Sequence, residues 1–250
     1  MFGNHRIISG GYTIGPSIQY LLATVIMVVV IGILILKKIG GFFWFFSLIF
    51  FVLEIFLILK TGLTEPGIVP ARSVSSTSPT ADLEQIVNGV TLNRKWCLTC
   101  RIHRPSRGKH CSLCNCCVDK FDHHCTFLSN CIGIRNYRYF ILMLLNSTIL
   151  ALLILLNGIF QSGLVRIGFI SGSVLTIAVV GNMLAYHLGL IAKGTTSYEE
   201  GKRFISDDKT YPYSLGGWRI NFQAFFYAPI EASKFSKNAS EMDVLVSDNA

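Results

Sequence analysis

The sequence predicts an α-helical integral membrane protein with four transmembrane helices and a metal-binding module between the second and the third. Three observations lead to this prediction. Of the 250 residues, 51% are hydrophobic and only 14% are charged, whereas soluble domains carry about 25% charged residues. Apolar stretches long enough to cross a bilayer flank a polar central region. All eight cysteines lie in that region, between Cys97 and Cys131.

The first two predicted spans form a hairpin over residues 17–60. Ser17–Leu36 is uncharged and rich in Ile, Leu and Val, which matches the roughly 20 residues that cross the hydrocarbon core. We expect it to be retained rather than cleaved as a signal peptide, because it is too long and no small-residue cleavage site follows it. The second span, Ile39–Leu59, begins with a run of aromatic residues and contains one acid, Glu54.

The last two predicted spans form a second hairpin over residues 139–192. This stretch contains a single charge, Arg166, near its middle. We therefore expect two helices joined by a turn around Gln161–Gly168. His187 lies in the last span, and a histidine there is more often a hydrogen-bonded packing residue than a catalyst.

The distribution of basic residues predicts the orientation of the four spans. Most Lys and Arg residues lie in the tail 1–16, the loop 61–138 and the segment 193–250, whereas the two hairpin connections hold only Lys37, Lys38 and Arg166. Basic loops stay on the cytosolic side, so both tails and the central loop are expected to be cytosolic. The net charge of +8 suits an anionic membrane face or a phosphate-bearing substrate.

The central loop divides into a linker and a module. Residues 61–94 form the predicted linker, and its Ser- and Thr-rich part, residues 71–90, is expected to be flexible. From Trp96 onward, residues 95–138 are dense in Cys, His, Arg and Gly. Cysteines that cluster in a reducing cytosol indicate metal binding or thiol chemistry rather than disulfides.

The spacing of Cys and His in the module predicts two zinc sites. The pattern Cys-x2-Cys-x9-His-x6-Cys occurs twice with identical spacing, and each copy supplies the four ligands of a closed tetrahedral site. The first set is Cys97, Cys100, His110 and Cys117. The second set is Cys111, Cys114, His124 and Cys131. Cys125 and Cys116 fall outside both copies.

Cys125 is therefore a thiol without a structural role, and it directly follows a zinc ligand. Asp122 and His123 lie immediately upstream. A carboxylate can fix the tautomer of an imidazole that accepts the thiol proton, and such a pair raises the thiolate fraction. In the alternative interpretation, Asp122 and His123 only orient the zinc ligands. That interpretation leaves Cys125 unexplained.

These residues resemble the cysteine-rich domain of the DHHC protein S-acyltransferases, the palmitoyltransferases. The resemblance includes Asp122-His123-His124-Cys125, both ligand sets, Asn136 and Phe140. Three flanking elements extend it. They are Thr64–Pro70, where Glu65 replaces the Asp of an Asp-Pro-Gly element, Thr196–Glu199, where Ser197 replaces Thr, and the carboxy-terminal segment that contains Asn221.

The resemblance implies a two-step reaction. The Cys125 thiolate would take a long-chain acyl group, expected to be palmitoyl, from acyl-CoA, with His123 as base and Asp122 orienting it. A cysteine of a membrane-associated substrate protein would then accept the acyl group at the cytosolic face of an endomembrane or of the plasma membrane. Two structural Zn²⁺ ions and acyl-CoA as co-substrate are expected. Candidate partners of the CoA phosphates are Arg101, Arg104, Arg107 and Lys109. For any one of these residues, the alternative that it belongs to a basic face against lipid head groups explains its presence equally well.

Other classes of protein are less consistent with the sequence. A membrane RING-type ubiquitin ligase would close its second site with Cys-x2-Cys, whereas here the last ligands are His124 and Cys131. A nucleic-acid-binding module is disfavoured by tethering between two spans. A catalytically silent zinc-stapled scaffold or accessory subunit remains the main alternative. The family commonly has Pro-Trp after its catalytic cysteine, and Thr126-Phe127 stands there instead.

Overall fold

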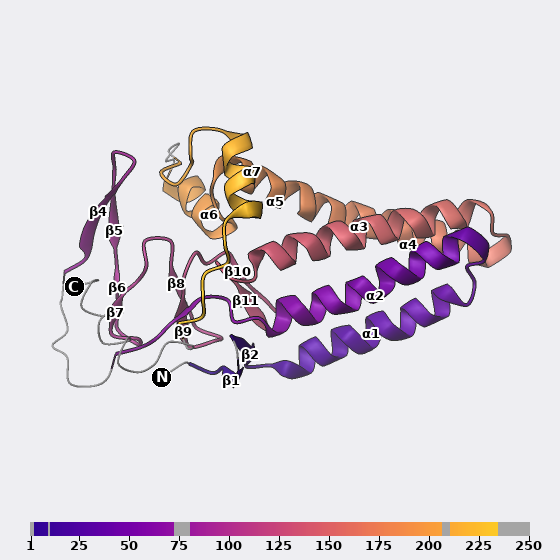
Figure 1. The fold of residues 1–250 in the computed structure, drawn as a ribbon, viewed down its shortest axis with the longest axis horizontal. Helices are drawn as coiled ribbons and strands as arrows, with labels where there is room; N and C mark the ends of the chain where they lie inside the picture. Colours follow the sequence, from indigo (N-terminus) through magenta and orange to yellow (C-terminus); the bar gives the residue numbers. More distant parts are fainter. Residues whose placement is uncertain (1–2, 10, 73–80, 207–210, 235–250) are drawn as a thin grey trace.

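The fold is described from a computed structural model that covers residues 3–9, 11–72, 81–206 and 211–234. Four long helical segments run side by side, and short strands gather at one end of them (Figure 1). The predicted fold class is confirmed, because four helices are long and apolar enough to span a membrane. A module with two clusters of metal-binding residues lies between the second and the third of them.

The first hairpin consists of α1 (Ile18–Leu36) and α2 (Gly41–Leu63). Their most apolar windows have mean hydropathies of 2.7 and 2.6. The helix α2 ends four residues beyond the predicted Leu59, so Lys60 lies in its last turn. There its ammonium group donates to the Tyr12 hydroxyl and lies over the Tyr139 ring. A cation at a helix C-terminus is favourable, which explains the extension.

The second hairpin consists of α3 (Tyr137–Ile159) and a 31-residue span, residues 163–193. That span comprises α4 (Gly163–Thr176), one π-helical turn η1 (Ile177–Gly181) and α5 (Asn182–Lys193). The turn is shorter than predicted, since Arg166 already lies in the first turn of α4. Its guanidinium donates to the carbonyls of Ile159 and Gln161, which would otherwise be unpaired at the end of α3.

Two hairpins lie outside the predicted spans and the metal-binding module, one in the tail 1–16 and one in the linker. In the tail 1–16, β1 (Arg6–Ser9) pairs with β2 (Tyr12–Ile14). In the predicted linker, β4 (Leu83–Val87) pairs with β5 (Val90–Arg94) across an Asn88-Gly89 turn. The prediction of a flexible segment over residues 71–90 therefore does not apply to its second half. Residues 73–80 of that segment lie outside the described part of the chain.

The module is built from short antiparallel pairs. One three-stranded sheet has the order β3 (Ile68–Val69), β9 (Cys116–Val118), β8 (Lys109–Cys111). Two further pairs are β6 (Trp96–Cys97) with β7 (Ile102–His103), and β10 (His123–Cys125) with β11 (Asn130–Ile132). The buried residues of the sheet are mostly cysteines, so the module has little apolar core apart from its two clusters.

Buried polar side chains attach the module to the helices. The Asn130 amide donates to the carbonyls of Gly62 and Thr64 at the end of α2. The Asn136 amide joins the Thr61 and Cys131 carbonyls. Each of these buried amide nitrogens has two carbonyl partners, and such buried hydrogen bonds favour one arrangement over its alternatives. The module is therefore fixed relative to the ends of α2 and α3.

Glu65 forms a second anchor where the chain leaves α2. It is fully buried, and its carboxylate accepts a hydrogen bond from Arg135 at 2.6 Å and one from Ser233 at 3.1 Å. Glu65 also accepts the backbone N–H of Gly67. A buried carboxylate needs such partners, and these partners tie the amino-terminal and carboxy-terminal sides of the module together.

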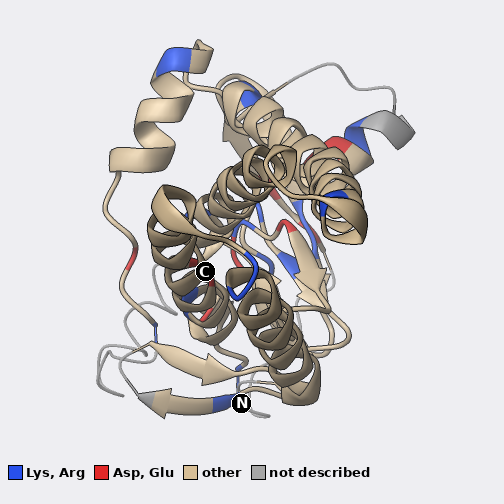
Figure 2. Ribbon diagram, turned by 90° about the vertical axis from the view of Figure 1, so that its right-hand side faces the viewer, with Lys and Arg blue, Asp and Glu red and all other residues tan. Residues whose placement is uncertain are grey.

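After α5 the chain returns to the module through α6 (Ser197–Ser206) and α7 (Trp218–Tyr227). Asn221 of α7 is buried and donates to the Ala192 carbonyl at 2.8 Å, so α7 is attached to the end of α5. Seen from the far end of the bundle, the long helices carry almost no charge (Figure 2). Residues 207–210 and 235–250 of the predicted carboxy-terminal segment lie outside the described part of the chain.

Candidate active site and metal sites

The structure brings together the first set of predicted zinc ligands. Sulfur atoms of Cys97, Cys100 and Cys117 lie 3.5, 3.4 and 3.9 Å from His110 Nδ1. All four donor atoms lie within 4.8 Å of one another. A tetrahedral site with Zn–S bonds of about 2.3 Å has edges of about 3.8 Å. Three thiols and an imidazole at this spacing fit a zinc ion.

The second set has the same geometry. Cys111, Cys114 and Cys131 lie 3.7, 3.3 and 3.6 Å from His124 Nδ1, and the four donors again lie within 4.8 Å of one another. The residues that follow the two Cys-x2-Cys knuckles, Arg101 and Asn115, both adopt left-handed backbone, with φ of 54° and 51°. The identical sequence spacing therefore corresponds to a repeated local backbone geometry.

Along β10 (His123–Cys125), the side chain of His124 points away from those of His123 and Cys125. Side chains alternate between the two faces of a strand, so His123 and Cys125 share one face of β10 while His124 points to the other. His124 joins the second metal cluster. Cys125 is buried among apolar side chains of the helices, including Leu21 and Phe140. The nucleophile candidate therefore lies at the boundary between the module and the bundle.

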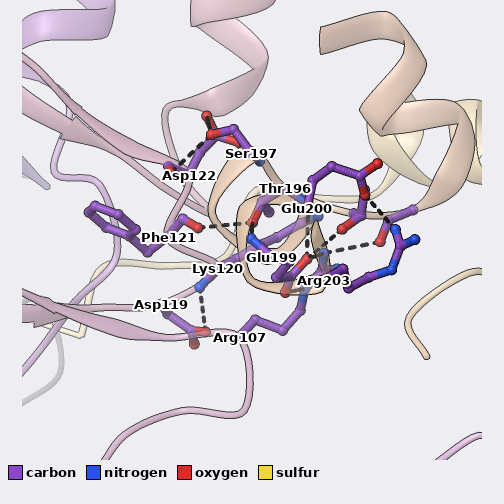
Figure 3. A network of polar contacts seen from close by, with 12 residues as sticks. Arg107, Asp119, Lys120, Phe121, Asp122, Thr196, Ser197, Glu199, Glu200 and Arg203 are labelled. Carbon is purple, nitrogen blue, oxygen red and sulfur yellow. Dashed lines mark hydrogen bonds and ion pairs between the residues drawn. The ribbon is translucent and has the colours of Figure 1, made fainter. Parts of the chain in front are cut away.

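Asp122 is 1% exposed and accepts hydrogen bonds from two directions. Its Oδ2 accepts from His123 Nδ1 at 2.7 Å and from Ser197 Oγ at 2.8 Å, and its Oδ1 accepts from the Ser197 backbone N–H at 2.8 Å. Figure 3 shows the contact with Ser197 at the start of α6. With Nδ1 bonded to Asp122, the Nε2 atom of His123 is the one available to a thiol.

Asp122 and His123 shift each other's pKa toward their charged forms. Burial works to lower the pKa of His123, but the hydrogen bond to Asp122 and the neighbouring Cys125 sulfur outweigh it and raise that pKa to about 9. Burial works to raise the pKa of Asp122, but the contacts with His123 and Ser197 lower it on balance. An ionised Asp122 beside a histidine with a raised pKa is the arrangement that stabilises a thiolate.

An ion pair fixes the segment that carries Ser197. Arg107 donates to both carboxylate oxygens of Glu199, at 2.7 and 2.6 Å, and to the Gly194 carbonyl. The Thr196 hydroxyl donates to the Phe121 carbonyl at 3.1 Å. Both contacts appear in Figure 3. A bidentate arginine–carboxylate pair defines orientation as well as distance, so the start of α6 has one position relative to Asp122.

The four basic residues predicted to contact CoA occupy different surroundings. Lys109 lines a cavity of about 340 Å³ together with Asp122, His123, Ser197 and Tyr198. Its ammonium group lies 4.5 Å from the centre of the Tyr198 ring. Arg107 is in the ion pair with Glu199, and Arg101 and Arg104 are not among the residues lining this cavity. Lys109 is therefore the member of the four that shares a cavity with the acid–base pair.

A second cavity, of about 470 Å³, lies within the helical bundle. Its walls come from α1, α2, α3 and α4, and include Gly32, Phe51, Glu54 and Ala151. A Cβ on Gly32 would meet the Phe51 ring at 2.0 Å, so only glycine allows α1 and α2 to approach here. The cavity can take an apolar chain, because its lining is mostly aliphatic and aromatic.

Sequence reasoning did not connect three residues with this site. Ser197 was noted only as part of a flanking element, Tyr137 was not noted, and His187 was interpreted as a packing residue. The structure places His187 Nδ1 2.8 Å from the Tyr137 hydroxyl, which agrees with a hydrogen-bonded role, and also 4.0 Å from Asp122. A histidine inside an apolar span was the available signal. Cys116 is buried beside the second cluster but belongs to neither donor set.

The structure combines four helices that are long and apolar enough to span a membrane with a cysteine-rich module that holds two Cys/His clusters and an acid–histidine–thiol group. Residues 90–165 match the family described as DHHC palmitoyltransferase. The chain is 30% identical to "Probable protein S-acyltransferase 2" of Arabidopsis thaliana, over 90% of this chain and 66% of that protein. It is 28% identical to "Protein S-acyltransferase 8" of the same plant, over 93% of this chain and 69% of that protein.

A similar protein outside plants is "Palmitoyltransferase ZDHHC5-B" of Danio rerio, which is 33% identical over 66% of this chain and 27% of that protein. The chain belongs to the DHHC palmitoyltransferase family, and its class is therefore that of the protein S-acyltransferases. It spans about two thirds of the length of the two plant relatives.

Proposed function

We propose that this chain transfers a long-chain fatty acyl group, of the palmitoyl class, from acyl-CoA through an acyl-Cys125 intermediate to cysteine thiols of substrate proteins. The observation that carries the proposal is that successive side chains of β10 face two different sites. His124 faces the second metal cluster, whereas His123 and Cys125 share the opposite face and His123 is bonded to a buried Asp122.

The proposed reaction has two thioester exchanges. In the first, Cys125 Sγ loses its proton to His123 and bonds to the thioester carbon of acyl-CoA. The bond from that carbon to the CoA sulfur breaks, and the CoA thiolate takes the proton from His123. In the second, a substrate thiol gives its proton to His123 and its sulfur bonds to the acyl carbon of acyl-Cys125. The bond from that carbon to Cys125 Sγ breaks, and the Cys125 thiolate takes the proton back from His123. Each exchange is nearly isoenergetic, so positioning and thiolate activation dominate catalysis.

Zinc ions, where bound, would hold the module in shape. Each donor set would supply all four ligands of its zinc ion from the protein, and such closed sites are structural. The first set runs from Cys97 to Cys117 through Cys100 and His110, and the second consists of Cys111, Cys114, His124 and Cys131. His124 is a ligand candidate next to Cys125, so a filled second site would fix the backbone of the nucleophile. No proton or acyl group passes through the metal in this proposal.

The bundle and the module supply separate binding regions for the two halves of acyl-CoA. The acyl chain fits the apolar cavity between α1, α2, α3 and α4, and the phosphates fit the polar side, where Lys109 is the basic residue nearest the acid–base pair. Arg101 and Arg104 remain candidates for the more distant phosphates. Arg107 is better explained as the partner of Glu199.

The proposed site of action is the cytosolic face of an endomembrane or of the plasma membrane. The basic residues of the module and of both tails support this orientation. Substrate proteins would then be membrane-associated proteins with cytosolic cysteines, which reach Cys125 from the polar side of the boundary.

Autoacylation tests the proposal. The purified full chain, incubated with a clickable palmitoyl-CoA, is expected to gain a hydroxylamine-labile label on Cys125. Cys125→Ser is expected to lose the label while keeping two zinc ions per chain. Cys116→Ser is the matched control, because it removes a buried module cysteine outside both donor sets. Wild-type protein that binds two zinc ions but gains no label would favour the silent scaffold instead.

A further inference from the structure

A second histidine lies beside the acid of the catalytic set and comes from a different span. His187 in α5 is 2% exposed, and its Nδ1 lies 4.0 Å from Asp122 Oδ2. The same Nδ1 lies 2.8 Å from the hydroxyl of Tyr137, the first residue of α3. Neither His187 nor Tyr137 takes part in the transfer steps described above.

The surroundings of His187 determine which tautomer is favourable. If Tyr137 donated its proton to Nδ1, that unprotonated nitrogen would place its negative partial charge 4.0 Å from Asp122 Oδ2. If Nδ1 carries the proton, its N–H donates to the Tyr137 oxygen and also presents the positive end of a dipole to Asp122 from 4.0 Å. The second arrangement is electrostatically favourable in a buried site, where such interactions are strong.

Aromatic packing fixes the orientation of His123 and His187 relative to each other. The Phe140 ring lies 5.2 Å from the rings of both His123 and His187, edge to face in each case. The Tyr137 ring also contacts the rings of His187 and of Phe225 in α7. Such pairs prefer this tilted geometry, so His187 has one orientation toward Asp122.

We propose that His187 and the Tyr137 hydroxyl are positioning residues for Asp122. The Nδ1–H dipole of His187 faces Asp122 Oδ2, the oxygen that also accepts hydrogen bonds from His123 and Ser197. Through Asp122 it favours the His123 tautomer whose Nε2 accepts the Cys125 proton. Span four thereby contributes to catalysis without touching the acyl group, and the inference rests on the proposed function of Cys125.

A third metal site is the competing explanation, since donors of Asp122, His123 and His187 lie within 4.8 Å of one another. The hydrogen bonds favour the positioning role. His123 Nδ1 is bonded to Asp122, His187 Nδ1 is bonded to Tyr137, and the Asp122 oxygens already accept from Ser197. A cation would have to displace each of these contacts.

The test compares single-turnover acylation of Cys125 by palmitoyl-CoA in purified full-length variants, with zinc content measured for each. His187→Leu is expected to lower the maximal rate constant about tenfold, as for loss of a partner of a buried charge. The half-saturating palmitoyl-CoA concentration and the two zinc ions per chain are expected to stay unchanged. His187→Asn places an amide nitrogen near the position of Nδ1 and is expected to restore most of the rate. Ala185→Leu, an exposed position two residues earlier in α5, is the control.

Two results would overturn the inference: a wild-type rate constant in His187→Leu, or equal losses in His187→Leu and His187→Asn. A third zinc ion in the wild type, absent from His187→Leu, would also overturn it in favour of a metal site. If His187→Leu loses zinc or fails to fold, Tyr137→Phe decides, because it removes only the hydroxyl. A loss of about threefold supports the inference, and an unchanged rate contradicts it. Wild-type protein without label on Cys125 would instead refute the proposed function.

Discussion

Ser197 offers the sharpest test of how Asp122 is positioned. It contributes two of the three hydrogen bonds that reach the Asp122 carboxylate, one from its hydroxyl and one from its backbone N–H. Ser197→Ala removes the hydroxyl and leaves the backbone contact. Hydrogen bonds to charged groups contribute about 1.5–3 kcal/mol. Because half of the Ser197 contact remains, we take the lower figure, which corresponds to about a tenfold loss of rate.

The assay is single-turnover labelling of Cys125 with clickable palmitoyl-CoA. Ser197→Ala is expected to lower the maximal rate constant about tenfold without changing the half-saturating acyl-CoA concentration, because the loss acts on the transition state. Ser197→Thr keeps the hydroxyl and is expected to stay within about twofold of the wild type. Equal rate constants for Ser197→Ala and the wild type, with zinc content intact, would show that this contact does not support His123.

Three further changes test other parts of the site. Lys109→Ala is expected to raise the half-saturating acyl-CoA concentration about fivefold at low salt, with less effect at high salt; equal salt dependence in Lys109→Ala and the exposed control Lys95→Ala would contradict the assignment. Ala151→Phe fills part of the bundle cavity and is expected to shift labelling toward shorter acyl chains, as read from competition between chain lengths. An unchanged preference would place the acyl chain elsewhere. Cys100→Ala is expected to leave one zinc ion per chain, whereas Cys116→Ala keeps two, by elemental analysis of the purified protein; zinc loss in Cys116→Ala would contradict the donor sets.

The two Cys/His clusters, and the exclusion of Cys125 from both, could be predicted from the sequence because their geometry is local. A Cys-x2-Cys knuckle fixes its own backbone, and equal spacing around His110 and His124 identified two equivalent sets. The same comparison excluded Cys125 from both. The structure adds the physical reason, since alternation along β10 turns His124 away from the face that carries Cys125.

The hairpins β1–β2 and β4–β5 both have turn signals in the sequence, although the composition around them does not indicate strands. Asn88-Gly89 between two β-rich runs is a strong hairpin signal, but the Ser- and Thr-rich stretch before it favoured a flexible interpretation. Gly10-Gly11, which stands between Ile7-Ile8-Ser9 and Tyr12-Thr13-Ile14, is a similar signal in the first 16 residues.

The partners of Asp122 could not be predicted in this way. Ser197 lies 75 residues downstream of Asp122 and reaches it only because the chain crosses the bundle twice in between. His187 meets Tyr137 across 50 residues. Spacing within a motif contains no information about such contacts, which depend on how α3 and α5 pack.

The distance along the chain between Asp122 and Ser197 has a consequence for biosynthesis. All eight cysteines are synthesised before α3, which begins at Tyr137, so the ligands of both metal clusters precede the last two spans in the growing chain. The carboxylate gains its Ser197 partner only after the fourth span has been synthesised and α6 has returned to the module. Under the proposed mechanism, a nascent chain would complete its zinc knuckles while its thiol is still poorly activated, and acyl transfer would begin only after the fourth span has been made.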